Sequence, residues 1–162
     1  MIVMQTSLHI RALVREMKQE LIGGEITSTA FYKKLRAAYI FVKTESAHWA
    51  FGLVFHPGGS GTFLVAASKI AVETTEKPWP VFDLVGATVA DITQSGLDRL
   101  FTISVKTPAG VRQIVCEAIG PTLCVSGLND IGLPLDVAQL AQSGTECPER
   151  TCRRGRAAIC QE

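Results

Sequence analysis

The first clear pattern along the chain is helical and runs from about Thr6 to Leu21. Apolar residues recur there every three or four positions, so they form one stripe of Ile10, Leu13, Val14, Met17 and Leu21. Thr6 or Ser7 can cap the start of such a helix, and Gly23-Gly24 can end it through a left-handed residue. The pattern therefore predicts a surface helix with one face against a core.

After the helix, the pattern changes to alternation of apolar and polar residues. From Glu25 to about Ala67 the chain is rich in Thr, Tyr, Phe, Val and Trp, with breaks at 44–46 and 56–61. Alternation resumes over 87–93, 101–106 and 111–118, and Pro108 lies in the turn between the last two segments. One helix with successive hairpin strands predicts an α+β fold built on an antiparallel β-sandwich.

The pattern weakens after Gly120. Residues 121–130 have no clear period, Leu133–Leu140 has the spacing of a short helix, and 143–162 carries four Arg and three Cys without apolar periodicity. We therefore predict a domain over residues 1–120 and a poorly patterned tail over 121–162. The tail is interpreted as disordered, or as a truncated or frame-shifted end.

Composition and charge indicate a globular protein rather than a membrane-spanning one. A chain of 162 residues with 47% apolar and 19% charged content can form one domain with a core, and no apolar run reaches the ~18 residues of a membrane span. Charge is unevenly distributed along the chain. Residues 1–43 hold seven Lys or Arg and three Glu, whereas residues 44–98 hold two Lys and six Asp or Glu. Without an export signal at Met1–Thr6, we expect a cytoplasmic protein with reduced thiols and with Cys116 in its core.

Several catalytic motifs are absent from the sequence. The glycine-rich run Pro57–Gly61 precedes a strand and lacks Gly-Lys-Ser/Thr, so it predicts a hairpin turn, with His56 at a strand end. There is no Gly-x-Ser-x-Gly, no His-Glu-x-x-His and no ligand set at metal spacing. We expect neither an enzyme nor a cofactor, metal or small-molecule site, and Trp79 between two prolines is interpreted as pinning a connector rather than stacking on a base.

Two groups of residues are candidates for binding. Asp98 and Arg99 lie in a loop between two predicted strands, where binding residues often occur. Arg11, Arg15 and Lys18 lie at i, i+4 and i+7 on one side of the predicted helix. That basic row is either an ordinary solvated helix face or a contact for an RNA backbone.

An ordered set of short motifs carries a resemblance to a known family. The motifs are Leu13–Met17, Gly23-Gly24, Asp98-Arg99 and Glu117–Gly120. In this order and spacing, from Thr6 to Gly120, the chain resembles the N-terminal module of the RqcH/NEMF family, also called NFACT or fibronectin-binding protein A-like proteins.

The resemblance implies a fold and a function. The fold would be that of the N-terminal domain of formamidopyrimidine-type DNA glycosylases, a β-sandwich with flanking helices. The function would be that of a ribosome-associated quality-control factor, which binds large subunits obstructed by peptidyl-tRNA and recruits aminoacyl-tRNA for template-free extension of the nascent chain. The ribosome would form the peptide bond, while Asp98 and Arg99 would bind the tRNA, with Arg99 gripping a phosphate or base edge and Asp98 orienting it.

The chain also departs from the family. His9 stands where some members carry an acid, the segment Lys77–Gly86 is short, and Pro121–Ser126 does not continue the family pattern. The family's helix-hairpin-helix, coiled coil and C-terminal RNA-binding domain have no counterpart in the sequence. Two alternatives remain: a base-excision DNA glycosylase, although Met1–Gln5 lacks the N-terminal Pro-Glu that such an enzyme uses, and a fibronectin-binding surface protein, which would need an export signal.

Overall fold

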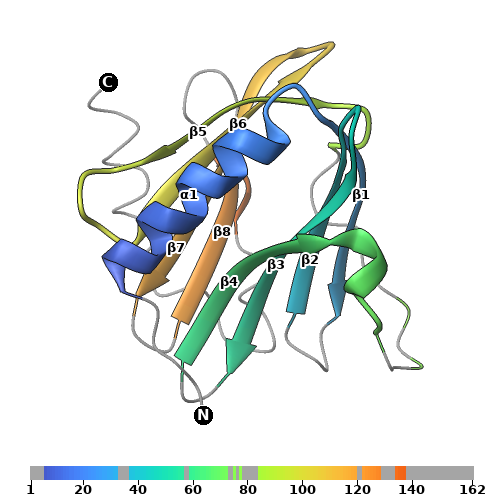
Figure 1. The fold of residues 1–162 in the computed structure, drawn as a ribbon. Helices are drawn as coiled ribbons and strands as arrows, with labels where there is room; N and C mark the ends of the chain where they lie inside the picture. Colours follow the sequence, from blue (N-terminus) through green and yellow to red (C-terminus); the bar gives the residue numbers. More distant parts are fainter. Residues whose placement is uncertain are drawn as a thin grey trace.

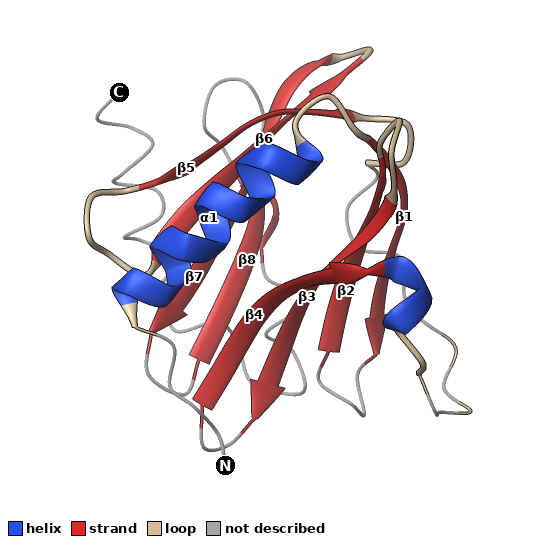
Figure 2. Ribbon diagram, in the orientation of Figure 1, coloured by secondary structure: helices blue, strands red, loops and turns tan. Residues whose placement is uncertain are grey.

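The computed structural model describes residues 6–32, 37–56, 59–72, 75, 77, 84–119, 122–128 and 134–137. Within these residues the chain forms one α-helix, one short 3-10 helix and nine strands (Figures 1 and 2). The helices are α1 (Ser7–Leu21) and η1 (Ala67–Lys69). The strands are β1 (Glu25–Tyr32), β2 (Ala37–Lys43), β3 (His48–His56), β4 (Gly59–Ala66), β5 (Thr88–Gln94), β6 (Leu100–Thr107), β7 (Gly110–Ile119), β8 (Thr122–Leu128) and β9 (Pro134–Val137).

Helix α1 begins and ends where the sequence pattern predicts. The hydroxyl of Thr6 accepts a hydrogen bond of 3.4 Å from the backbone N–H of His9, and the backbone N–H of Thr6 donates to Nδ1 of His9 at 3.1 Å. These two bonds form a capping box, which satisfies donors at the helix start. At the other end Gly23 has a φ of +84°, in the left-handed region that favours glycine. All residues of the apolar stripe are buried.

The strands form one antiparallel sheet in the order β4-β3-β2-β1-β5-β6-β7-β8-β9. The sheet curls so that β4 contacts β7 and β8, and β3 contacts β8. Strands β1 to β4 and β5 to β9 thus make two layers, and α1 packs against β5 and β4 on one side of the curl (Figure 1). The predicted α+β class is confirmed. The two layers belong to one continuous sheet, however, and one α-helix flanks it within the described residues.

The two layers meet at β1 and β5 and share a core. The backbone N–H of Gly23 donates to the carbonyl of Val89 at 2.9 Å, and the N–H of Val89 donates to the carbonyl of Gly24 at 2.8 Å. Deeper inside, the rings of Phe51 from β3 and Phe101 from β6 pack edge to face with centroids 5.9 Å apart. The apolar stripe of α1 joins the same buried cluster. A single core therefore connects the helix with both layers.

The predicted hairpin at the glycine-rich run and the predicted burial of Cys116 are both confirmed. Strand β3 ends at His56, β4 starts at Gly59, and the two pair antiparallel, so the glycine-rich run is part of a hairpin rather than a phosphate loop. Cys116 is completely buried in the core. Burial raises the pKa of its thiol, because the thiolate would lose its hydration there.

Predictions for the end of the chain were partly wrong. Residues 122–128, expected to lack regular structure, form β8 beside β7, and Pro134–Val137, expected within a helix, form β9 beside β8. Without β8, the edge of β7 would leave backbone N–H and C=O groups unpaired. Pairing with such an edge can determine the structure of a segment whose own sequence pattern is weak. Trp79 and the Arg- and Cys-containing stretch 143–162 lie outside the described residues.

Candidate functional site

The hairpin turn between β5 and β6 presents Asp98 and Arg99. The backbone N–H of Ser95 donates to the carbonyl of Leu100 at 3.1 Å, and the N–H of Asp98 donates to the carbonyl of Ser95 at 3.0 Å. Gly96 has a φ of +56°, which a residue with a side chain adopts less easily. In this turn Asp98 is exposed and Arg99 is half-buried. Both side chains are therefore within reach of a ligand.

The Asp98 carboxylate bonds to the backbone of its neighbour. Its Oδ1 accepts a hydrogen bond of 2.8 Å from the backbone N–H of Arg99. The Asp98 carboxylate and the Arg99 guanidinium, both among the described residues, form no salt bridge with each other, so the direct brace expected between them is not present. Asp98 shapes the turn, and the guanidinium of Arg99 is left for other contacts.

Gln94 ties this turn to the start of α1. Its Nε2 donates to the backbone carbonyl of Asp98 at 2.7 Å and to that of Ser7 at 3.1 Å. One amide group thereby links residues that lie 87 positions apart in the sequence. No pattern in the sequence indicates this contact, because Gln94 looks like any polar residue at the end of a strand.

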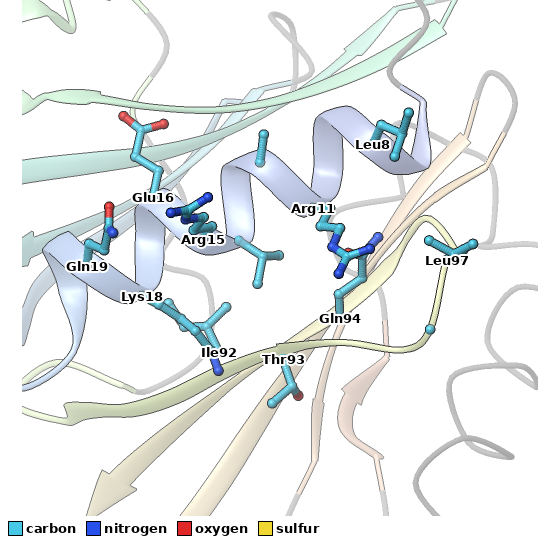
Figure 3. Close-up of a pocket in the computed structure, with 13 residues that line it drawn as sticks. Leu8, Arg11, Arg15, Glu16, Lys18, Gln19, Ile92, Thr93, Gln94 and Leu97 are labelled. Carbon is cyan, nitrogen blue, oxygen red and sulfur yellow. The ribbon is translucent and has the colours of Figure 1, made fainter.

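A groove of about 1200 Å³ lies between α1 and β5; the basic row and the first residues of the turn line it, whereas Asp98 and Arg99 themselves do not. Figure 3 shows the basic side of the helix facing β5 and the turn that follows it. This volume exceeds the ~300–1,000 Å³ of typical small-molecule pockets. The residues that line the groove are Leu8, Arg11, Ala12, Val14, Arg15, Glu16, Lys18, Gln19, Ile92, Thr93, Gln94, Gly96 and Leu97. Asp98 and Arg99 follow directly after Leu97 in the chain.

Three of the four charged residues that line the groove are cations, and the fourth is Glu16. Arg11 and Arg15 are exposed, and within the described residues neither forms an ion pair. The Nζ of Lys18 lies 3.4 Å from Oδ1 of Asp91, and these side chains are 44% and 51% exposed. Such an exposed pair contributes about 0–1 kcal/mol, so Lys18 can exchange its partner for a ligand at little cost. All three residues of the predicted basic row therefore line the groove.

Sequence reasoning missed the apolar residues at one end of the groove. Leu8 and Leu97 are 67% and 65% exposed, and Figure 3 shows both at the end of the groove nearest the turn. Leu8 lies outside the apolar stripe of α1, and Leu97 stands alone in a polar turn, so neither belongs to a pattern. Large exposed apolar side chains beside cations often mark a contact surface.

The described part of the chain contains no cluster of three or more His, Cys, Asp or Glu side chains that could hold a metal ion. None of the helices described there is both long and apolar enough to cross a bilayer.

Comparison with solved structures identifies proteins that have a similar fold. The sequence matches no protein-family model, and no curated protein matches it. The fold is similar to that of the N-terminal domain of the fibronectin-binding protein PavA from Streptococcus pneumoniae, with a TM-score of 0.69 and 18% identity over 88% of this chain and 56% of that one. The N-terminal region of the fibronectin/fibrinogen-binding protein from Streptococcus suis gives a TM-score of 0.67 with 16% identity, over 81% and 52% of the two chains. The fibrinogen-binding protein from Staphylococcus aureus gives 0.63 with 18% identity, over 88% and 56%.

These similarities establish an α+β fold shared with N-terminal domains of PavA-like proteins. The chain spans about half the length of each solved chain that it matches, since the covered shares are 56%, 52% and 56%. The glycosylase-like fold that the sequence resemblance implied is not supported by these comparisons.

Proposed function

We propose that this chain is the tRNA-binding module of a ribosome-associated quality-control factor. Such a factor binds large ribosomal subunits obstructed by peptidyl-tRNA in the cytoplasm and recruits aminoacyl-tRNA for template-free extension. In this proposal the chain holds the tRNA and catalyses no reaction itself. The part assigned to it here is the groove between α1 and β5, together with the turn that carries Asp98 and Arg99.

One observation carries the proposal: the basic row of α1 and the Asp98-Arg99 turn belong to one surface. Arg11, Arg15 and Lys18 line the groove that the turn closes at one end. A row of cations favours a phosphate backbone, because phosphate contacts release counterions and supply most of the affinity for nucleic acid. The half-buried Arg99 beside this row can add a bidentate contact to a phosphate or base edge.

The groove is tested by tRNA binding as a function of salt. We expect Arg11→Gln/Arg15→Gln to weaken tRNA binding and to reduce the slope of log affinity against log salt by about 2, one for each arginine that no longer neutralises a phosphate. Lys69→Gln is the matched control, because Lys69 is an exposed cation on η1 outside the groove. An equal loss of affinity in the control and in the groove variant would remove the groove from the proposal.

The turn is tested by variants that separate charge from geometry. Asp98→Asn keeps an oxygen that can accept from the Arg99 backbone, whereas Asp98→Ala removes it. If the carboxylate contacts tRNA, both variants weaken binding; if it only shapes the turn, Asp98→Asn binds like the parent. Arg99→Lys keeps the charge and loses the planar fork, so a bidentate contact predicts weaker tRNA binding by this variant as well. Parent-like affinity in Asp98→Ala and Arg99→Lys would contradict the role of the turn.

A second candidate function comes from the names of the structural neighbours. Two of them are called fibronectin-binding or fibronectin/fibrinogen-binding proteins, and the third a fibrinogen-binding protein. Binding of this chain to immobilised fibronectin, unchanged in Arg11→Gln/Arg15→Gln and accompanied by no affinity for tRNA, would favour this function over the first.

A further inference from the structure

Asp91, an acidic residue of β5, lies beside the basic row of α1. Its Oδ1 is 3.4 Å from the Nζ of Lys18, and Figure 3 shows Lys18 well away from Leu97, which belongs to the turn at the other end of the groove. Lys18 and the neighbour of Asp91 in the chain, Ile92, both line the groove, whereas Asp91 itself does not. The carboxylate therefore holds one cation of the groove without occupying the groove.

A bulge in β5 accounts for the position of Asp91. Val89 and Ile92 are both buried although they lie three positions apart, because the register between β5 and β6 shifts between Val89 and Asp91. Bulges of this kind change the direction of a side chain and are common beside functional sites. The strand thereby presents an exposed acid between two core residues, in contact with the helix that carries the basic row.

A second contact orients the Asp91 carboxylate. Its Oδ1, the oxygen nearest to Lys18, also accepts a hydrogen bond of 2.8 Å from the backbone N–H of Ile92. The orientation of the carboxylate therefore does not depend on Lys18 alone, and less side-chain freedom is lost when the ion pair forms. An asparagine at this position would keep an oxygen for the Ile92 N–H and would lose only the charge.

Asp91 and an anionic ligand compete for Lys18. Arg11 and Arg15 are exposed and form no ion pair within the described residues, so they can contact a ligand without losing a partner. The charge of Lys18 is already balanced by Asp91. A phosphate that contacts Lys18 either displaces the carboxylate or shares the ammonium group with it, and in both cases two negative charges lie close together.

We infer that Asp91 is an internal competitor, which holds Lys18 in the free protein and lowers the affinity of the groove for a phosphate chain. Arg11 and Arg15 make the first contacts, and Lys18 joins them when the next phosphate replaces the carboxylate. That exchange is favoured because a chain held by the two arginines presents its next phosphate at a high effective concentration. The inference rests on the proposed function in placing a phosphate backbone in the groove, and it adds a residue that regulates the same site.

Binding of tRNA and of inorganic polyphosphate to charge variants tests the competition. We expect Asp91→Asn, which keeps the acceptor for the Ile92 N–H, to lower the Kd for both probes by about 2- to 5-fold. It should also steepen the slope of log affinity against log salt by up to about 1, because one more cation is available to neutralise a phosphate. Glu45→Gln is the matched control, since it removes the same charge from an exposed residue outside the groove, and it should bind like the parent.

The Lys18→Gln variant shows whether Asp91 acts through Lys18. We expect Asp91→Asn to improve binding less in the Lys18→Gln background than in the parent, because no cation is left there for the carboxylate to hold. A residue that only stabilised the fold would not raise the affinity when its charge is removed, nor would its effect depend on Lys18.

Four results with polyphosphate would overturn the inference. They are no binding by the parent, equal or weaker binding by Asp91→Asn, an equal improvement in Glu45→Gln, and the same effect of Asp91→Asn with and without Lys18. The two probes keep this inference apart from the proposed function. Binding of polyphosphate without binding of tRNA would reject the proposed function, and the polyphosphate results would still decide the role of Asp91. If tRNA binding weakens in Arg11→Gln/Arg15→Gln but stays unchanged in Asp91→Asn, the inference alone fails.

Discussion

At the scale of single residues, a few hydrogen bonds decide how the candidate site is presented. The sequence shows Asp98 and Arg99 as neighbours and suggests a charge pair. In the structure the Asp98 carboxylate instead accepts from the backbone of Arg99, and the amide of Gln94 holds the turn against α1. Gln94 is therefore a positioning residue, because it acts on the site through Asp98 and Ser7.

Loss of the Gln94 amide should loosen the turn without unfolding the protein. We expect Gln94→Ala to lower the free energy of unfolding by about 1–2 kcal/mol, because two hydrogen bonds of about 0.5–1.5 kcal/mol are removed and partly replaced by water. Hydrogen exchange at the Asp98 amide, which bonds to Ser95, should speed up more than exchange at core amides of β6. A merely structural role would move all these amides together, so uniform acceleration would contradict the positioning role.

Tyr39 makes the stability of the protein depend on pH in the alkaline range. Partial burial, and then the nearby Tyr32, raise the pKa of Tyr39 above its ordinary value of 10.0. Below that value Tyr39 is protonated in both the folded and the unfolded chain, so its contribution to stability is fully present. As pH rises further the unfolded Tyr39 ionises first, and the free energy of unfolding falls.

This dependence is measured by urea unfolding between about pH 9 and pH 11. Tyr39→Phe cannot ionise and should lose less stability than the parent over this range. Tyr32→Phe removes only the smaller of the two causes and should lie between them. If parent and Tyr39→Phe lose stability in parallel, other groups account for the alkaline effect.

At the scale of secondary-structure elements, local patterns predict what short-range rules control. The 3.6-residue stripe and the Thr6 cap predict α1, and alternation predicts strand structure from β1 to β7, because one face of each element is buried. The separation of β1 from β2 was not predicted, since the breaks in the pattern lie at 44–46 and 56–61. The same rules fail at β9. The spacing of apolar residues around Pro134–Val137 predicts a helix, but pairing with the neighbouring strand β8 determines the structure of this segment. They also give no sign that Leu8 and Leu97 line the same groove, because the two residues belong to elements that are distant in the sequence.

The strand pair β3 and β4 depends on a glycine beneath an aromatic ring. We expect Gly52→Ala to destabilise the fold by about 1–2 kcal/mol, because the new methyl group forces the Phe63 ring off the strand. Gly61→Ala on β4 is the matched control, since a Cβ there meets no atom within 4 Å and its change should be close to zero. Thermal or urea unfolding of both variants checks this, and equal stabilities would show that the ring moves aside freely.

At the scale of the whole molecule, the candidate site depends on a core that both layers share. The groove lies between α1 and β5, and the layer β1 to β4 joins this part of the fold where β1 pairs with β5. The sequence predicts that strands will pair in hairpins, but it does not show that the sheet curls until β3 and β4 meet β8. That closure brings Phe51 and Phe101 together, 50 residues apart in the sequence, and packs the two layers against each other.

Coupling between these two rings should therefore bind the layers into one cooperative unit. We expect Phe51→Leu and Phe101→Leu each to lower the free energy of unfolding by about 1–2 kcal/mol, because each leaves packing space in a dense core. The double variant should fall short of the sum by about 0.5–1.5 kcal/mol, since either single substitution already removes the edge-to-face packing of the two rings. Hydrogen exchange at amides of β2 and β6 should report the same global free energy of unfolding in the parent, and should fall by the same amount in either single variant. Strict additivity, or a fall confined to one layer, would show instead that the layers unfold separately.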